Sequence, residues 1–180
     1  MMFYTTLYDS PLGEITLGGD GDNLVGLWMS KQKYFAETLK GSIEEKSDLL
    51  IFTKTKKWLD TYFAGGRPPI SDVPLAPIGS EFRKSVWDIL CEIPYGQCTT
   101  YGEIAKKMAS RMNKKSMSSQ AVGGAVAHNG ISIIIPCHRV VGSNGSLTGF
   151  AGGIDKKIKL LELEGVDMSS FFVPNKGTAL

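Results

Sequence analysis

Four prolines within residues 67–78 divide this chain of 180 residues into two parts with different hydrophobic periods. Proline fixes φ and lacks a backbone N–H, so neither a helix nor a central strand is expected across this stretch. Short β-prone runs precede it, and runs with a helical period follow it. The sequence therefore predicts an N-terminal domain over residues 1–66, a linker over 67–78, a C-terminal domain over 79–166 and a loose tail over 167–180.

The N-terminal part alternates β-prone runs with turn signals from Phe3 to Met29, and this pattern predicts an antiparallel meander. Residues 47–64 then have helical spacing, with Ser47 or Asp48 as the N-cap. Gly65 follows as the expected end of the helix. Strands followed by one helix make a small α/β domain. The apolar stripe of this helix consists of Phe52, Trp58, Leu59, Tyr62 and Phe63.

The C-terminal part is predicted to be mainly helical. Apolar residues from Phe82 to Ile93 share one helical face behind Ser80 as N-cap. Thr100 and Glu103 have the spacing of a capping box, in which each side chain bonds to the backbone N–H of the other, and a second helix follows. A third helix is expected from Gln120 to His128, which with the second suggests a helix-turn-helix. Its inward-facing residues are expected to be Ala121, Val122, Ala125 and Val126.

After these helices the sequence predicts a buried strand over Ile131–Ile135, a hairpin connection at Gly142–Ser146 and a final helix over Asp155–Glu164. Glycines inside a helix cost stability. Gly123 and Gly124 in the third helix therefore suggest that another backbone approaches closely there.

The composition is 42% hydrophobic and 21% charged, with both signs mixed, which is typical of a globular protein rather than a disordered or membrane protein. Basic residues form two local clusters along the chain. Either cluster is compatible with a phosphate contact or with a solvated face. The clusters are Arg111, Lys114 and Lys115 in one loop, and Lys156, Lys157 and Lys159 at the start of the final helix.

Three cysteines and two histidines lack the spacing of a structural zinc site, and the odd number of cysteines suggests reduced thiols. The N-terminus lacks a basic region followed by an apolar run, and no stretch approaches the length of a membrane span. We therefore expect a cytoplasmic protein without a bound metal.

Cys137 is the cysteine whose neighbours carry chemical information. It follows an apolar, β-branched run and Pro136, and it precedes His138 and Arg139. A thiol at a strand end beside two potential cations is favoured in its thiolate form, which is the nucleophile. Adjacent side chains on an extended segment point to opposite faces, so from residue types alone a buried structural cysteine is an equal alternative.

The segment Pro136–Val140 resembles the active-site motif of the O6-alkylguanine-DNA alkyltransferases, also called methylated-DNA–protein-cysteine methyltransferases. Gly79–Leu90, Ile93–Ala105, Ala121–Ala125 and Gly152–Gly165 are similar to the same family in the same order. Five motifs in one order make the resemblance specific over the C-terminal half. The N-terminal part is similar more weakly, in its element order and its SPLG turn.

The resemblance implies an α/β fold class, with a small ribonuclease H-like N-terminal domain containing an antiparallel sheet and a mainly helical, winged-helix-like C-terminal domain. It implies that the recognition helix enters the minor groove of double-stranded DNA containing O6-alkylguanine. The damaged base would rotate out of the duplex, because a protein thiol cannot reach the alkyl carbon inside the stack. The alkyl group would then pass irreversibly to Cys137. No cofactor, metal or membrane is implied, a monomer is expected, and O4-alkylthymine is left open as a substrate.

The resemblance also assigns roles to matching positions. Cys137 would be the nucleophile, while Glu164 and His138 would accept its proton through a water. Asn129 would hold the turn before the active-site segment, and Tyr101 would protonate the leaving guanine or cradle its phosphate. The expected DNA-binding residues are Gln120, Ala121, Gly123, Gly124, Thr100, Tyr101 and Arg139. The expected substrate pocket consists of Tyr101, Ser132, Val140, Phe150, Ala151 and Gly152.

Three features depart from the usual pattern of the family. Gln120 stands where most members have an arginine that enters the stack in place of the flipped base, and Gly130 replaces the usual proline after Asn129. The loop from Met108 to Ser119 is longer than the commonest version. These departures concern the search for damage and the stiffness of the active-site loop rather than the chemistry of the thiol.

Two other functions are compatible with parts of the sequence. A damage sensor with this fold would bind alkylated DNA without reacting, but Cys137 argues against it. A cysteine hydrolase would pair Cys137 with His128 or His138 as base and would turn over an acyl substrate.

Overall fold

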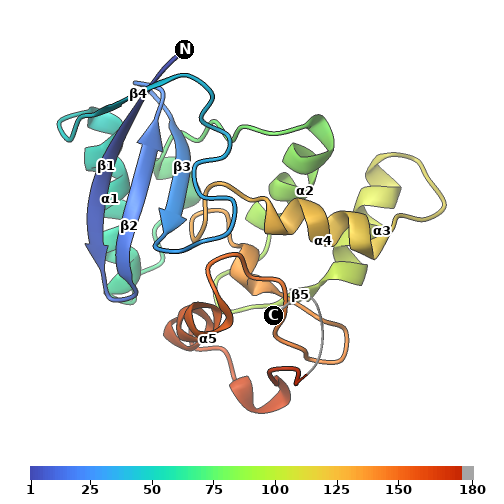
Figure 1. The fold of residues 1–180 in the computed structure, drawn as a ribbon. Helices are drawn as coiled ribbons and strands as arrows, with labels where there is room; N and C mark the ends of the chain where they lie inside the picture. The colour runs from blue at the N-terminus through green and yellow to red at the C-terminus, as the bar shows by residue number, and fades with distance from the viewer. Residues whose placement is uncertain (176–180) are drawn as a thin grey trace. The chain divides into compact units, whose positions relative to one another are not determined.

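The computed structural model describes residues 1–175, drawn from the N-terminus in blue to the C-terminus in red in Figure 1. The chain folds into two compact units. One unit consists of Met1–Gly79 together with Gly130–Ile134, and the other consists of Ser80–Asn129 together with the chain from Ile135 onward. A short piece of the C-terminal half therefore belongs to the N-terminal unit.

The first unit contains a four-stranded sheet in the order β3-β2-β1-β4 (Figure 1). Strands β1 (Met2–Ser10), β2 (Gly13–Gly19) and β3 (Leu24–Met29) form the predicted antiparallel meander. The sheet as a whole is mixed, because β4 (Ser42–Glu45) pairs in parallel with β1. All residues of β4 are exposed, so it carries no hydrophobic alternation that could have indicated a strand.

Helix α1 (Leu50–Phe63) lies against the sheet and buries the apolar stripe expected of it, except that Phe63 is half-buried. Ser47 and Asp48 are not its N-cap, since Leu49 holds that position without a side-chain cap. The proline-rich stretch, which includes a 3₁₀ turn at Ile70–Asp72, is bonded to this unit. The carbonyl oxygen of Pro69 accepts a bond of 3.0 Å from the Trp58 indole, and Leu24 donates to Pro74 at 2.8 Å.

The predicted strand over Ile131–Ile135 is wrong. Only Ile131 pairs, through an isolated bridge to Leu27, whose N–H donates to the Gly130 carbonyl at 2.8 Å. Ile133 has a φ of 70°, a left-handed conformation that a β-branched residue adopts only under strain. The β-branched run has the composition of a strand, but its backbone turns instead of extending.

The second unit is built on α2 (Glu81–Cys91), α3 (Tyr101–Arg111), α4 (Ser119–Ala127) and α5 (Ile154–Leu163), with a parallel pair formed by β5 (Thr99–Thr100) and β6 (Val140–Val141). The predicted caps are confirmed: Ser80 accepts the N–H of Arg83, and the capping box at the start of α3 is complete. Ala121 is exposed rather than inward-facing, while the other three predicted inward residues of α4 are buried.

The tail is ordered over its first residues. A 3₁₀ turn spans Met168–Ser170, and Phe172 donates to Gly145 and accepts from Leu147 at 3.1 and 2.9 Å. A bond of 2.8 Å from Gly142 to Ser146 closes the predicted turn, but Ser146 forms a bridge to Phe172 rather than a hairpin ladder. The expectation of a loose tail is therefore wrong up to residue 175, and residues 176–180 lie outside the described part of the chain.

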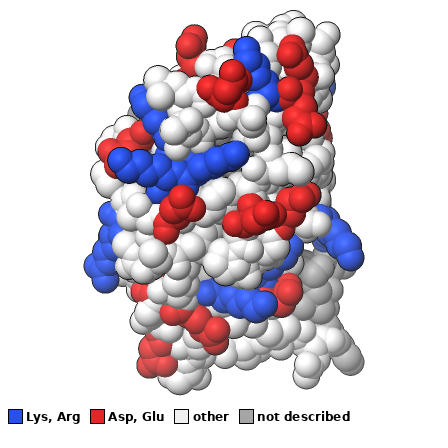
Figure 2. All heavy atoms as spheres, turned by 90° about the vertical axis from the view of Figure 1, so that its left-hand side faces the viewer, with Lys and Arg blue, Asp and Glu red and all other residues white. Residues whose placement is uncertain are grey.

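The surface shows the mixture of charges that the composition indicates. On the face drawn in Figure 2, basic and acidic side chains are interspersed rather than separated by sign. Within residues 1–175, the structure has no helix with both the length and the apolar character needed to span a bilayer.

Candidate active site

Cys137 begins a 3₁₀ turn, η2 (Cys137–Arg139), rather than ending a strand as expected. The turn is held by a bond of 2.8 Å from the Cys137 N–H to Ile135 and one of 3.1 Å from Arg139 to Pro136. Successive side chains in a 3₁₀ helix point about 120° apart. The thiol, the imidazole and the guanidinium therefore leave the backbone in three directions, and all three residues are buried.

Glu164, at the end of α5, gathers three donors on its buried carboxylate. Nε2 of His138 bonds to one oxygen, and Nε of Arg139 donates to the other at 2.6 Å. The Gly96 N–H also donates to that second oxygen, at 3.2 Å. Burial alone would raise the pKa of Glu164, but the bonds from His138 and Arg139 outweigh it and lower the pKa to about 2. Glu164 is therefore a carboxylate at neutral pH.

His138 is fully buried and is held as a neutral ring. Burial lowers its pKa below 6.5, an effect that the contact with Glu164 only partly offsets. Because Glu164 is ionised, we assign the ring proton to Nε2. Nδ1 then carries a lone pair, and it has no hydrogen-bond partner within residues 1–175. A neutral imidazole with one nitrogen held by a carboxylate and the other available is a general base.

The thiol of Cys137 is not activated in the way the sequence suggests. Burial raises its pKa, and the hydrogen bond from Asn129 and the charge of Lys157 offset this only in part. The two neighbouring residues do not supply the expected positive charge, because His138 is neutral and the Arg139 guanidinium is bound to Glu164. The predicted thiolate is therefore wrong for the resting protein, and Cys137 needs a base to become a nucleophile.

Asn129 connects the site to the end of α4. Its side-chain amide donates to the Ile135 carbonyl at 2.9 Å and also bonds to the Cys137 thiol. Asn129 and Ile135 flank the segment Gly130–Ile134 that belongs to the first unit. This one side chain thus fixes both the start of η2 and the hydrogen bonding of the thiol.

Tyr101, the first residue of α3, reaches the loop that precedes α5. Its hydroxyl donates to the Thr148 carbonyl at 3.0 Å, and burial raises its pKa to about 12. Nζ of Lys157 donates to the same carbonyl at 2.9 Å and to the Val140 carbonyl. Gly149 makes room for this arrangement, since a Cβ there would lie 2.5 Å from the Tyr101 hydroxyl.

Lys157 is a site residue that sequence reasoning missed, because it was grouped with exposed basic residues. Its side chain is fully buried, and burial lowers its pKa to about 8. The helical period of α5 could have indicated that Lys157 is buried. Lys157 shares one face with Leu160, Leu161 and Glu164, all of which are buried.

The other predicted pocket residues are divided between the units. Val140 and Phe150 are buried in the second unit, where Ala151 and Gly152 are half-buried. Ser132 belongs to the first unit, and its hydroxyl donates to Gln32 at 3.1 Å.

The predicted DNA-binding residues lie in three places: on α4, at the start of α3 and in η2. Gln120, Ala121 and Gly124 are exposed on α4, Gly123 is half-buried, and a Cβ at Gly124 would meet no atom within 4 Å. Thr100 caps α3, and Tyr101 lies at the site. Arg139 is buried and donates to Glu164 and to the Ile93 carbonyl, so we do not include it in a DNA-binding surface.

Both parts of the chain match known protein families. Residues 81–166 match the DNA binding domain of 6-O-methylguanine DNA methyltransferase, and residues 3–77 match its ribonuclease-like domain. The methylated-DNA–protein-cysteine methyltransferase of Methanosarcina acetivorans is 46% identical over 162 residues, which cover 90% of this chain and 98% of the relative. The methylated-DNA–protein-cysteine methyltransferase of Haemophilus influenzae is 39% identical over 161 residues, which cover 89% of this chain and 86% of the relative.

Solved structures have the same fold over nearly the whole chain. The Mycobacterium tuberculosis O6-methylguanine methyltransferase superposes with a TM-score of 0.75 at 40% identity, covering 91% of this chain and 93% of that one. A structure of Mycobacterium tuberculosis OGT in complex with DNA gives a TM-score of 0.74 at 38% identity, with 95% of each chain covered. The expected combination of a ribonuclease-like domain and a helical DNA-binding domain is confirmed.

Proposed function

We propose that Cys137 is the methyl acceptor, on the premise that this chain belongs to the O6-methylguanine DNA methyltransferase family. The protein binds DNA and repairs it by moving the methyl group of O6-methylguanine to one of its own cysteines. This activity sets aside the cysteine hydrolase and the non-reacting damage sensor. The proposal adds which cysteine reacts, how it loses its proton and how the lesion reaches it.

The observation that carries the proposal is the state of His138, which follows the buried Cys137 in η2. Its Nε2 is held by the Glu164 carboxylate, and its unprotonated Nδ1 has no partner among the described residues. A thiol whose pKa burial has raised needs such a base. Glu164 stabilises the imidazolium that forms when His138 takes the proton.

The transfer is a direct displacement. Sγ of Cys137 forms a bond to the methyl carbon while the bond from that carbon to O6 breaks, and its electron pair returns to the guanine. The proton of Cys137 passes through a water to His138 and then to the guanine ring, so the products are a neutral guanine in the DNA strand and a thioether on Cys137. The Tyr101 hydroxyl keeps its proton because burial raises its pKa, and when the substrate binds, it exchanges its bond to the Thr148 carbonyl for a hydrogen bond to the leaving base.

The substrate is duplex DNA with the lesion rotated out of the stack. The duplex contacts the exposed face of α4, where Gly123 and Gly124 allow the close approach of a phosphate backbone. The amide of Gln120 takes the place of the flipped base, since it can donate to and accept from the orphaned cytosine.

The test is to incubate the protein with duplex DNA containing O6-methylguanine and to map the methyl group by mass spectrometry of peptides. We expect one methyl group per molecule, on Cys137 alone. Cys137→Ser should remain unmodified, whereas Cys98→Ser, a control at a half-buried cysteine, should react normally. Methylation of the Cys137→Ser variant would refute the assignment, and repair of more than one O6-methylguanine per protein molecule would refute the single turnover.

A further inference from the structure

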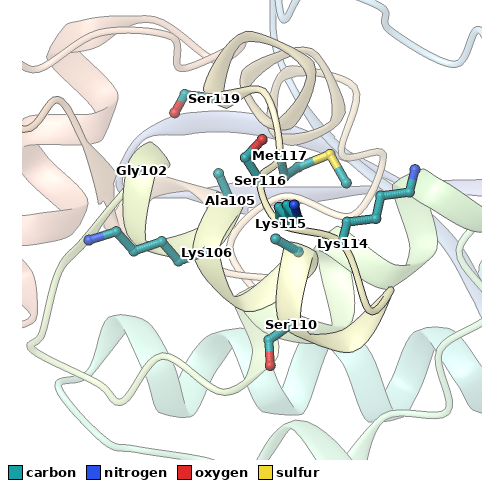
Figure 3. A pocket seen from close by; sticks show the side chains of 10 residues that line it. Gly102, Ala105, Lys106, Ser110, Lys114, Lys115, Ser116, Met117 and Ser119 are labelled. Carbon is teal, nitrogen blue, oxygen red and sulfur yellow. The ribbon is translucent and has the colours of Figure 1, made fainter.

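A basic pocket lies between α3 and the loop that joins it to α4 (Figure 3). It has a volume of about 560 Å³ and is lined by ten residues between Gly102 and Ser119, among them Lys106, Lys114 and Lys115. Its other lining residues are small, apolar or hydroxyl-bearing, and among residues 1–175 no acidic side chain lines it. The pocket therefore combines a hollow surface with three ammonium groups.

Nearby acidic groups compensate Lys106 only in part and leave Lys114 and Lys115 uncompensated. Glu92 pairs with Arg111, so that cation and that carboxylate neutralise each other. Glu103 lies close enough to Lys106 for the lysine to contribute to lowering its pKa, but its carboxylate already accepts bonds from the Thr99 hydroxyl and the Thr100 N–H. Lys114 and Lys115 are exposed.

Hydrogen bonds hold both ends of the loop in place. Asn113 takes a φ of 53° after α3, and the N–H groups of Asn113 and Lys114 bond back to Ser110 and Ala109 at 3.2 and 2.8 Å. This is the Schellman pattern of a helix end. At the other end, the Ser118 side chain caps α4. The lysines are therefore presented from a defined backbone rather than from a loose loop.

The recognition helix itself carries no positive charge. Residues 119–127 of α4 contain no lysine, arginine or histidine, and its exposed Gln120 is neutral. Affinity for DNA, however, depends largely on cations that neutralise phosphates. If α4 contacts the groove, the neighbouring cations must come from beside the helix, and the pocket borders its first residue, Ser119.

We propose that this pocket is a docking site for the phosphate backbone of DNA next to the segment contacted by α4. The inference rests on the proposed function, in which α4 meets the duplex. Figure 3 shows that Lys106 and Lys114 extend to opposite sides of the pocket, with Lys115 between them. Cations spread in this way match a row of phosphates along a strand, whereas a single small anion requires donors that converge.

The test compares how binding of an undamaged duplex depends on salt in matched variants. Each phosphate contact contributes about 0.9 to the slope of log affinity against log salt concentration. We expect Lys114→Gln combined with Lys115→Gln to reduce the slope by about 1.8, and Lys106→Gln by about 0.9. Lys54→Gln combined with Lys57→Gln removes the same charge from exposed positions of α1 and should leave the slope unchanged.

Two further measurements distinguish loss of a DNA contact from damage to the reaction site and from binding of free phosphate. The variants should transfer the alkyl group of free O6-benzylguanine to Cys137 at the wild-type rate, which shows that the site is intact. Inorganic phosphate, titrated alone, should show no saturable binding that the double variant abolishes. An unchanged slope, an equal change in the α1 control or such a phosphate site would each overturn the inference. Failure of the wild-type protein to react would instead refute the proposed function.

Discussion

At the scale of single residues, burial disfavours the charged forms of both Cys137 and His138. It raises the pKa of the thiol and lowers the pKa of the imidazole, so both groups rest in their neutral forms. The charge of the site is carried instead by Lys157 and by Glu164 and Arg139, which bond to each other at 2.6 Å. The reaction centre is thus an uncharged acid and base pair backed by an ion pair.

Glu164→Gln tests this arrangement. The amide can still bond to His138, but it cannot stabilise the imidazolium, so transfer to Cys137 should slow by roughly 100-fold, as for loss of a general base. Binding to duplex DNA should change little, because Glu164 is buried. The measurements are single-turnover transfer rates and duplex affinity.

Glu162→Gln is the matched control, since it makes the same substitution at an exposed position of the same helix and should leave the rate unchanged. A thermal melt of each variant shows whether Arg139, left without its carboxylate, has destabilised the fold. Normal transfer with lost DNA binding would contradict the role assigned to Glu164.

At the scale of elements, the loop between β6 and α5 is held by two hydrogen bonds to the backbone carbonyl of Thr148. Tyr101 from α3 and Lys157 from α5 both donate to this oxygen, at 3.0 and 2.9 Å. Gly149 follows directly, with a φ of 75° that favours glycine. The Tyr101 hydroxyl can therefore occupy this position only because residue 149 is a glycine and has no side chain.

Gly149→Ala should displace Tyr101 as well as strain the backbone. Gly165 provides the control, because its φ of 76° is nearly the same but a Cβ there would meet no atom within 4 Å. Gly165→Ala should cost about 1–2 kcal/mol of unfolding free energy, the cost of an L residue in the left-handed region. Gly149→Ala should cost more and should also slow methyl transfer, as measured by urea unfolding and single-turnover kinetics. Equal effects of the two substitutions on stability and rate would contradict the proposed packing.

At the scale of the whole molecule, the buried site couples stability to pH. The pKa values of His138 and Glu164 are lower in the folded chain than their ordinary values of 6.5 and 4.5. The unfolded chain therefore binds more protons at acid pH, and these groups favour folding only where both are deprotonated. Their contribution is complete above pH 6.5 and is lost on acidification.

We expect the free energy of unfolding to fall below pH 6.5 as His138 titrates, and to fall further between pH 4.5 and about 2 as Glu164 titrates. Urea unfolding at a series of pH values measures this. In the Glu164→Gln variant, the decrease in unfolding free energy between pH 4.5 and about 2 should be smaller. Stability that is constant or rising as the pH falls from 6.5 would contradict the direction of both shifts.

Much of the molecule follows from the sequence alone, because local patterns act over a few residues. The caps at Ser80 and Thr100 and the helical faces of α2 and α4 depend on groups three or four positions apart. The meander of β1 to β3 follows from alternation and turn signals in one continuous stretch. The order of five motifs in turn indicated the family and Cys137 as its candidate nucleophile.

Only the tertiary structure decided the state of the site, because protonation and backbone path depend on groups far apart in sequence. Cys137 rests as a thiol because burial outweighs the opposing effects of Asn129 and Lys157, and Arg139 faces Glu164 rather than solvent. Ile131 bonds within the first unit, which bends a run with strand composition out of a strand. Local propensity is weaker than these long-range contacts, so burial and pairing overrode it at these positions.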